Sequence, residues 1–335
     1  MAGMAKRTLM LLGLLLLPLV GCTQEPDFWI GANVKIAGDA TWDSAAAKQS
    51  LQDLADSGAD RGLLVAFTWQ ADPTSNEPVI GSDSSPESVR AGLAQMKQVG
   101  LVPVLKIHLW IPEHWAGEAQ PTDVDLWFDA YRDAVLPLAR VAEQEQVPAL
   151  VVATELRNLE QADNWAALVA AVREVYSGKV LYVADSLQRA EEFPHWDLFD
   201  AIGSSLYPSL PSEPMQRDTQ MREAAQRLLT LGERHQKPVW VAEVGLRSAD
   251  DVLSAPWESP EQRELPVDLD LQKTILEKWK SVLNQPGIEG MGIWCWYTNP
   301  DAGGENDTDF TIQNKPAESI FRERAAAQPA GAAGG

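Results

Sequence analysis

Two glutamates each follow a short apolar run of the kind that forms a buried strand. Glu155 follows the run at residues 149–153 (ALVVA) and Thr154, and Glu243 directly follows residues 238–242 (PVWVA). Two carboxyl groups roughly 5 Å apart across a cleft can cleave a glycosidic bond with retention, because one attacks the sugar while the other donates and then accepts a proton. A single glutamate at a strand end more often pairs with a loop lysine or arginine. The chemistry therefore depends on whether the fold brings these two together.

Eight apolar runs without clean alternation read as strands buried on both faces. They are residues 28–34, 62–67, 102–107, 149–153, 180–184, 201–206, 238–242 and 290–296. Helical patterns lie between them at residues 45–57, 86–100, 126–144, 165–176, 215–235 and 269–284. The alternation predicts an α/β fold, a single-domain (β/α)8 TIM barrel, with a doubly wound open sheet as the alternative. No glycine-rich nucleotide motif follows the first strand, so the nucleotide-binding form of the open sheet has no support.

In such a barrel the carboxyl ends of all strands meet at one face, where the chemistry of these enzymes is found. Glu155 would end the fourth strand and Glu243 the seventh, so both are expected in one cleft. Tryptophans at or just beyond strand ends could stack on sugar rings, since an indole offers a flat apolar face and an N–H donor. These candidate sugar platforms are Trp69, Trp110, Trp115, Trp294 and Trp296.

Alternation in the last strand predicts that Trp294 and Trp296 both point inward and that Cys295 faces the helices. Cys295 then acts as a small buried hydrophobe and not as a nucleophile, because no histidine partner accompanies it. Three further tryptophans, in helical patterns, are expected to pack between helices and barrel: Trp127, Trp165 and Trp279.

The composition limits the possible partners and cofactors. With 27 Lys and Arg against 48 Asp and Glu, the formal net charge is −21, which argues against nucleic-acid binding and favours neutral over polyanionic glycans. His108 and His114 lack a third histidine or a cysteine at ligand spacing, so we expect no metal and no cofactor. The GxSxG motif of serine hydrolases does not occur in the sequence.

Several ordered motifs between about residues 31 and 321 resemble clan A of the glycoside hydrolases and, more closely, glycoside hydrolase family 113, whose characterised members are β-mannanases. The motifs are AFTWQ (66–70), LKIH (105–108), WAG (115–117), ATEL (153–156), FPHWDLFD (193–200), IG (202–203), LYP (206–208), KPVWVAEVG (237–245) and NKPAE (314–318). Their order and spacing, not any one of them, carry the resemblance.

The resemblance implies that Glu155 is the acid/base and Glu243 the nucleophile. It also implies that Tyr207 hydrogen-bonds Glu243 and that Lys106, with His108 as the alternative, contacts the sugar. Most of the clan has Asn directly before the acid/base, where it contacts the sugar 2-hydroxyl. In this chain Thr154 occupies that position. Family 113 also lacks the Asn, so this difference favours that family. Which residue contacts the sugar 2-hydroxyl stays open.

The N-terminus resembles the signal of a bacterial lipoprotein. Lys6 and Arg7 precede an apolar run too short to span a bilayer, and residues 19–22 (LVGC) match a lipobox. We expect residues 1–21 to be removed, Cys22 to carry the lipid and residues 22–27 to tether a domain at residues 28–324. Thr23 is not the Asp that retains lipoproteins at the inner membrane, so the outer membrane of a cell envelope is favoured. Residues 325–335 are low in complexity and are expected to be disordered.

These observations favour a lipid-anchored retaining glycoside hydrolase that cleaves a β-linked polysaccharide, either β-mannan or a related exopolysaccharide. A monomer is expected, with the polysaccharide as substrate and the membrane contacted through Cys22. Two alternatives remain open: a catalytically weak carbohydrate-binding envelope lipoprotein, and a transglycosylase that remodels surface glycans with the same two carboxylates.

Overall fold

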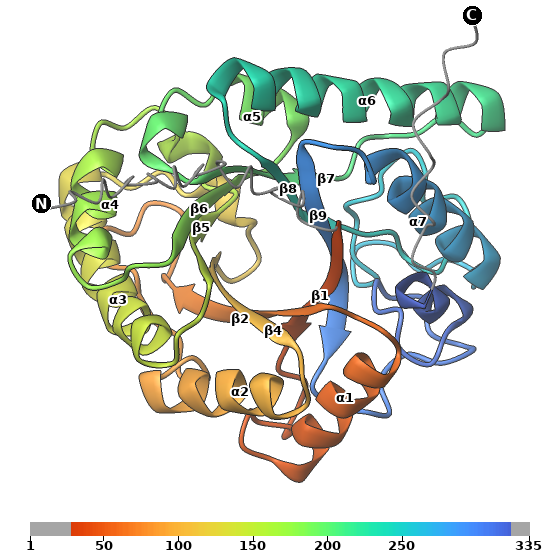
Figure 1. Cartoon of the computed structure of the whole chain (residues 1–335), viewed down its shortest axis with the longest axis horizontal. Helices are drawn as coiled ribbons and strands as arrows, with labels where there is room; N and C mark the ends of the chain where they lie inside the picture. Colours follow the sequence, from red (N-terminus) through yellow and green to blue (C-terminus); the bar gives the residue numbers. More distant parts are fainter. Residues whose placement is uncertain (1–27, 323–335) are drawn as a thin grey trace, which may run out of the picture.

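The computed structural model describes residues 28–322, and eight parallel strands close into a barrel there. The strands are β1 (Trp29–Lys35), β2 (Arg61–Trp69), β4 (Val102–Trp110), β5 (Ala149–Thr154), β6 (Lys179–Ala184), β7 (Ala201–Leu206), β8 (Val239–Val244) and β9 (Ile288–Tyr297). β1 pairs with both β2 and β9, which closes the ring of strands seen in Figure 1. The predicted TIM barrel is confirmed.

Helices surround the strands (Figure 1). They are α1 (Ala45–Asp56), α2 (Pro86–Gln98), α3 (Val124–Gln144), α4 (Trp165–Arg173), α5 (Leu187–Glu192), α6 (Pro214–His235) and α7 (Leu269–Leu283). The sequence pattern predicted all of them except α5, whose six residues are too few to show a helical period. Serine side chains cap α1 and α2 at Ser44 and Ser85, as the Ser-Pro-Glu start of α2 indicated.

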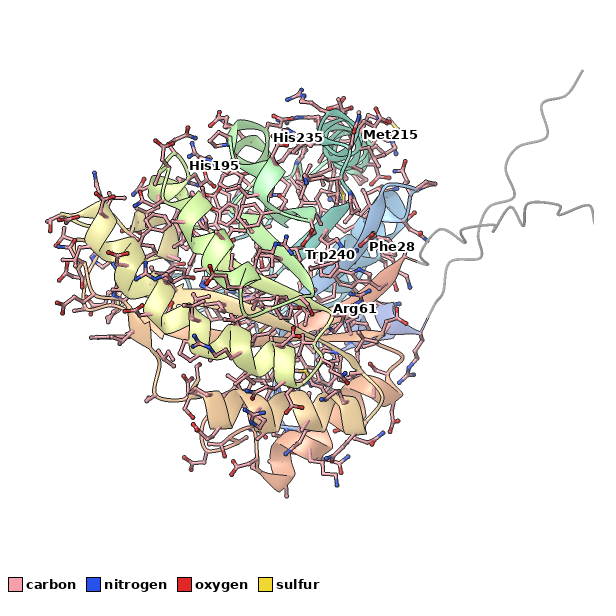
Figure 2. The ribbon with its side chains drawn as sticks, turned by 60° about the vertical axis from the view of Figure 1, so that its left-hand side comes forward. Phe28, Arg61, His195, Met215, His235 and Trp240 are labelled. Carbon is pink, nitrogen blue, oxygen red and sulfur yellow. The ribbon has the colours of Figure 1, made fainter. Side chains whose placement is uncertain are left out.

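The amino-terminal end of the barrel is filled by large side chains. The rings of Trp29 and Trp240 meet edge to face at 4.9 Å, and the Arg61 guanidinium lies over both. Figure 2 shows Arg61 and Trp240 at this end of the barrel. This end is closed by packing, so a substrate can reach the barrel only at the carboxyl ends of the strands.

Two strands run further toward that open face than the sequence predicted. β2 and β4 stay paired up to Trp69 and Trp110, and a short strand β3 (Val79–Ile80) then folds back antiparallel on β2. The pattern missed β3 because a two-residue strand has no period. It forms a raised rim beside the carboxyl ends of β2 and β4.

Among residues 28–322, no helix is both long and apolar enough to cross a bilayer. The predicted signal, the tether with Cys22 and the tail at residues 325–335 lie outside the described residues.

Candidate active site

Glu243 lies on β8 with both carboxylate oxygens occupied by donors. The Lys106 ammonium, from β4, donates to Oε1, and the Tyr207 hydroxyl, directly after β7, donates to Oε2 at 3.2 Å. Burial and the neighbouring Glu243 raise the pKa of Tyr207 well above its usual value, so Tyr207 remains a protonated donor. Glu243 is 3% exposed and is held in one orientation by these two contacts.

Glu155 follows the last residue of β5 and turns the chain out of the barrel. Its φ is +59°, in the left-handed region that residues with a Cβ rarely adopt, and its amide donates to the carbonyl of Val183 on β6 at 2.8 Å. Such backbone strain is typical of functional positions, where the surrounding structure enforces it. The indole Nε1 of Trp115 donates to Glu155 Oε2 at 2.7 Å and orients the carboxyl group.

The electrostatic surroundings of Glu155 favour its protonated form. Burial, together with the charge of Glu243, raises the pKa of Glu155 to about 8. The carboxyl group is therefore mostly neutral at pH 7 and can donate a proton, as a general acid must. Glu243 instead accepts bonds from a cation and a hydroxyl, which are the bonds of an ionised carboxylate. Two carboxyl groups with such different surroundings can take the two different roles of acid and nucleophile.

Lys106 is wholly buried beneath this pair. Its ammonium donates to Glu243 and, at 2.9 Å, to Oδ1 of Asn33 on β1. Burial lowers the pKa of Lys106, while the charge of Glu243 opposes that effect. The Asn33 amide in turn donates to the carbonyls of Ala242 and Ile293.

Asn33 was not among the predicted site residues. The available signal was an amide in the middle of an apolar strand, because a buried amide must find several partners. Its role is to tie β1 to β8 and β9 and to fix the lysine that holds Glu243.

His108 stands beside the nucleophile candidate as a neutral imidazole. Burial lowers its pKa to about 4. Nδ1 lies 3.1 Å from the carbonyl of Leu109, and since a carbonyl only accepts, Nδ1 carries the proton. Nε2 is then an acceptor, 4.0 Å from Glu243 Oε1, and could accept a bond from a sugar hydroxyl.

Aromatic rings lead from the carboxylates to a pocket at the rim. Trp294 contacts His108, His108 contacts Phe67, and Phe67 meets Trp110, with ring centroids 5.8 to 6.2 Å apart. The pocket has a volume of about 560 Å³ and is lined by Phe67, Trp69, Ile80, Asp83 and Trp110, among others. Trp69 is 40% exposed and Trp110 54%, so both offer ring surface to a ligand.

The prediction for Trp296 was wrong. This ring is 1% exposed, and its Nε1 donates to the Ser50 hydroxyl on α1 at 2.8 Å, on the helix side of the barrel. The pairing of β1 with β9 skips Cys295, because Asn33 pairs with Trp294 and Val34 with Trp296. This bulge interrupts the alternation, so Trp294 faces the cleft while Trp296 faces α1.

The predictions for the three tryptophans in helical patterns are confirmed. Trp127, Trp165 and Trp279 are buried, as expected of residues between helices and barrel. Cys295 is buried as expected, but the bulge removes the alternation from which its direction toward the helices was predicted. Burial raises the pKa of the Cys295 thiol to about 11, which is unlike that of a nucleophilic cysteine.

Within residues 28–322, no group of three or more His, Cys, Asp or Glu side chains could hold a metal ion. His114 pairs with Glu118 at 2.7 Å on the exposed loop after β4. The candidate site is thus a cleft built from carboxylates, one buried lysine and aromatic rings.

A (β/α)8 barrel with two coupled carboxyl groups in an aromatic cleft has the architecture of the barrel glycoside hydrolases. The model of glycoside hydrolase family 113 matches residues 34–315, and the chain belongs to this family. A comparison with curated protein sequences found no match.

Solved structures of the same family have a similar fold. The family 113 β-mannanase of Alicyclobacillus acidocaldarius, in complex with ManMIm, is 23% identical with a TM-score of 0.78, covering 88% of this chain and 96% of that one. A family 113 β-1,4-mannanase, also solved as a complex, is 21% identical with a TM-score of 0.78, covering 89% and 100%. The family 5 mannosidase of Rhizomucor miehei is 10% identical with a TM-score of 0.60, covering 89% and 92%.

Proposed function

We propose that this family 113 enzyme hydrolyses β-1,4-linked mannan within the chain and with retention, using Glu243 as nucleophile and Glu155 as acid/base. The contrast between the two carboxyl groups carries the proposal. Glu155 is buried with a pKa of about 8, while Glu243 accepts bonds from Lys106 and Tyr207.

In the first step, a carboxylate oxygen of Glu243 attacks the anomeric carbon of the sugar. The bond from that carbon to the glycosidic oxygen breaks, and the leaving oxygen takes the proton of Glu155. The products are a glycosyl ester on Glu243 and a shortened chain with a free hydroxyl. Lys106 and Tyr207 keep the attacking carboxylate in line, and Trp115 keeps Glu155 directed at the leaving oxygen.

In the second step, the ionised Glu155 takes a proton from water. The water oxygen attacks the anomeric carbon, the ester bond breaks, and Glu243 leaves as a carboxylate. Two displacements at one carbon return the original configuration.

Three observations support mannan as the substrate. The family 113 enzymes with similar folds are named β-mannanase and β-1,4-mannanase. The net charge of −21 favours a neutral glycan. Aromatic side chains extend from the carboxylates to the pocket at Trp69 and Trp110, as a polymer of several sugars requires.

The experiment that tests this function is a comparison of mannan, glucan and galactan as substrates. Mannan should yield new reducing ends and a falling viscosity, with products that keep the β configuration by NMR. Binding of mannan without release of reducing ends would refute hydrolysis, and products longer than the substrate would indicate a transglycosylase.

Activity should fall at alkaline pH because Glu155 must be protonated to act. Since burial raises its pKa to about 8, the acid form persists below that pH and is lost above it. The profile of kcat/KM against pH is therefore expected to have its alkaline limb near pH 8. A limb near the usual value of a glutamic acid would contradict this role for Glu155.

Replacing Trp110 by alanine should weaken polymer binding without disturbing the chemical step. The ring is 54% exposed and lies at the pocket, away from the two carboxylates. Loss of one stacking platform of this kind should raise KM about tenfold and leave kcat within about twofold. Steady-state kinetics on mannan measure this, with Val102→Ala, an exposed apolar side chain (42%) at the start of β4 on the closed end of the barrel, as a control. A drop in kcat with KM unchanged would contradict a binding role.

We also propose that the enzyme is anchored to the cell envelope through a lipid on Cys22, with the outer membrane favoured. The lipobox at residues 19–22 supports this location. Cys22→Ala should move the protein from the membrane fraction to the soluble fraction, or leave an unprocessed precursor. An unchanged membrane fraction with normal processing would refute the anchor.

A further inference from the structure

Trp115, which holds Glu155, is itself covered by a cation. The guanidinium carbon of Arg157 lies 4.5 Å from the centre of the Trp115 ring. Arg157 begins a short 3-10 helix (Arg157–Leu159) two residues after Glu155. Arg157 and Glu155 thus both follow the end of β5 and contact the same indole. Arg157 lies over the ring face, and Glu155 accepts the hydrogen bond of the ring N–H.

The arginine is fixed in this position. Its Nε donates to Oδ2 of Asp185 at 2.5 Å, and a terminal nitrogen contacts the same oxygen. Asp185 follows β6, its side chain is 1% exposed, and the Ser186 hydroxyl donates to its other oxygen at 3.0 Å. Arg189 from α5 donates to the carbonyl of Arg157 at 3.2 Å. A guanidinium bonded on one edge to a buried carboxylate is held in place over the indole.

A cation over an indole face draws electron density from the ring, which strengthens the ring N–H as a donor. The stack also restricts rotation of the indole. The direct effect of the charge on Glu155 is weaker, because the Arg157 side chain is 47% exposed and water screens it. The influence of Arg157 on Glu155 therefore passes through the hydrogen bond of Trp115.

We propose that Arg157, oriented by Asp185, is a positioning residue that acts through Trp115 to aim the carboxyl group of Glu155 at the leaving oxygen. The inference rests on the proposed role of Glu155 as acid/base. It extends the support of the acid to Asp185, directly after β6, whereas Lys106, Asn33 and Tyr207 support the nucleophile.

The first test compares substrates that do and do not need an acid. Arg157→Ala should lower kcat/KM on an unactivated manno-oligosaccharide about fivefold, as loss of one partly exposed cation–π contact allows. The 2,4-dinitrophenyl β-glycoside of the same sugar has a leaving group that departs without a proton. On this substrate, kcat/KM of Arg157→Ala should stay within about twofold of the wild-type value. Equal losses on both substrates would overturn the proposal, since a general structural defect impairs both.

The second test is the pH profile. The indole N–H stabilises the ionised form of Glu155, so weakening that bond raises the pKa above its value of about 8. In Arg157→Ala the alkaline limb should move to higher pH. An unmoved limb would overturn the route through the indole.

The third test is a double-mutant cycle. Trp115→Phe keeps a ring for Arg157 but removes the N–H. If Arg157 acts through that donor, adding Arg157→Ala to Trp115→Phe should change kcat/KM less than about twofold, whereas independent effects would multiply. Multiplying effects would overturn the proposal.

The matched control is Arg173→Ala. Arg173 likewise pairs with an aspartate, Asp200, at 2.6 Å, but Asp200 precedes β7 and lies at the amino-terminal end of the barrel. Arg173→Ala should leave kcat/KM on both substrates and the position of the alkaline limb unchanged. Activity of Glu243→Gln equal to that of the wild-type enzyme would refute the proposed function. If Arg157→Ala lowers kcat/KM equally on both substrates while Glu243→Gln is inactive, only this inference is refuted.

Discussion

Replacing Glu243 by glutamine should lower kcat/KM on mannan by a factor on the order of 10⁵, as removal of a covalent nucleophile does in other enzymes. Glutamine keeps the volume of Glu243 and can still accept the bond from Tyr207, but its neutral amide cannot form the glycosyl ester. The result is read from reducing-end release and from mass spectrometry of the protein after a brief exposure to a dinitrophenyl glycoside. Wild-type enzyme should carry a glycosyl group on the peptide that contains Glu243.

A suitable control for this variant is Glu289→Gln. Glu289 is also a glutamate on a barrel strand, paired with Lys179 at 2.9 Å and with the Trp240 indole at the closed end of the barrel. It should retain activity within about threefold, since it is remote from the reacting atoms. Activity of Glu243→Gln close to that of the wild-type enzyme would refute the assignment of the nucleophile.

Replacing Glu155 should have the second largest effect, a loss of about 10²- to 10⁴-fold on mannan. The loss arises because the glycosidic oxygen must leave without a proton. With a dinitrophenyl leaving group, Glu155→Ala should form the glycosyl ester at nearly the wild-type rate and then stall, since no base activates water. The measurement is a burst of dinitrophenolate followed by a slow steady rate.

Azide then distinguishes the two carboxylates by product configuration. In Glu155→Ala, azide attacks the glycosyl ester and should give the β-glycosyl azide, because two displacements have occurred. In Glu243→Ala, azide fills the space of the lost nucleophile, displaces the leaving group directly and should give the α-glycosyl azide. If Glu155→Ala gave the α-azide and Glu243→Ala the β-azide, Glu155 would be the nucleophile and Glu243 the acid/base.

The barrel and the position of both glutamates could be predicted from the sequence because they depend on local patterns. Each strand is a short apolar run, and Glu155 and Glu243 are the polar residues that end two of them. In a parallel barrel all such ends meet at one face, so the shared cleft follows from topology alone. The contact of Tyr207 with Glu243, which the family resemblance implied, is present at 3.2 Å.

Trp296 shows where a local pattern fails. Alternation with a period of two predicted an inward ring, but β9 bulges at Cys295 and directs Trp296 to Ser50 on α1. A bulge depends on how one strand pairs with its neighbour, and that pairing has no signature within the strand itself.

The sequence by itself determined the barrel, the two carboxyl groups and the aromatic residues of the open face, because strand periodicity and strand order are properties of the chain. The tertiary structure decided the environment of each carboxyl group. Lys106 reaches Glu243 from 137 residues away, and Trp115 reaches Glu155 from 40 residues away. Arg157 meets its anchor Asp185 across 28 residues. The surroundings of a carboxyl group depend on burial and on the groups nearby in space, so the contrast on which the proposed roles of Glu155 and Glu243 rest arises only when the strands close.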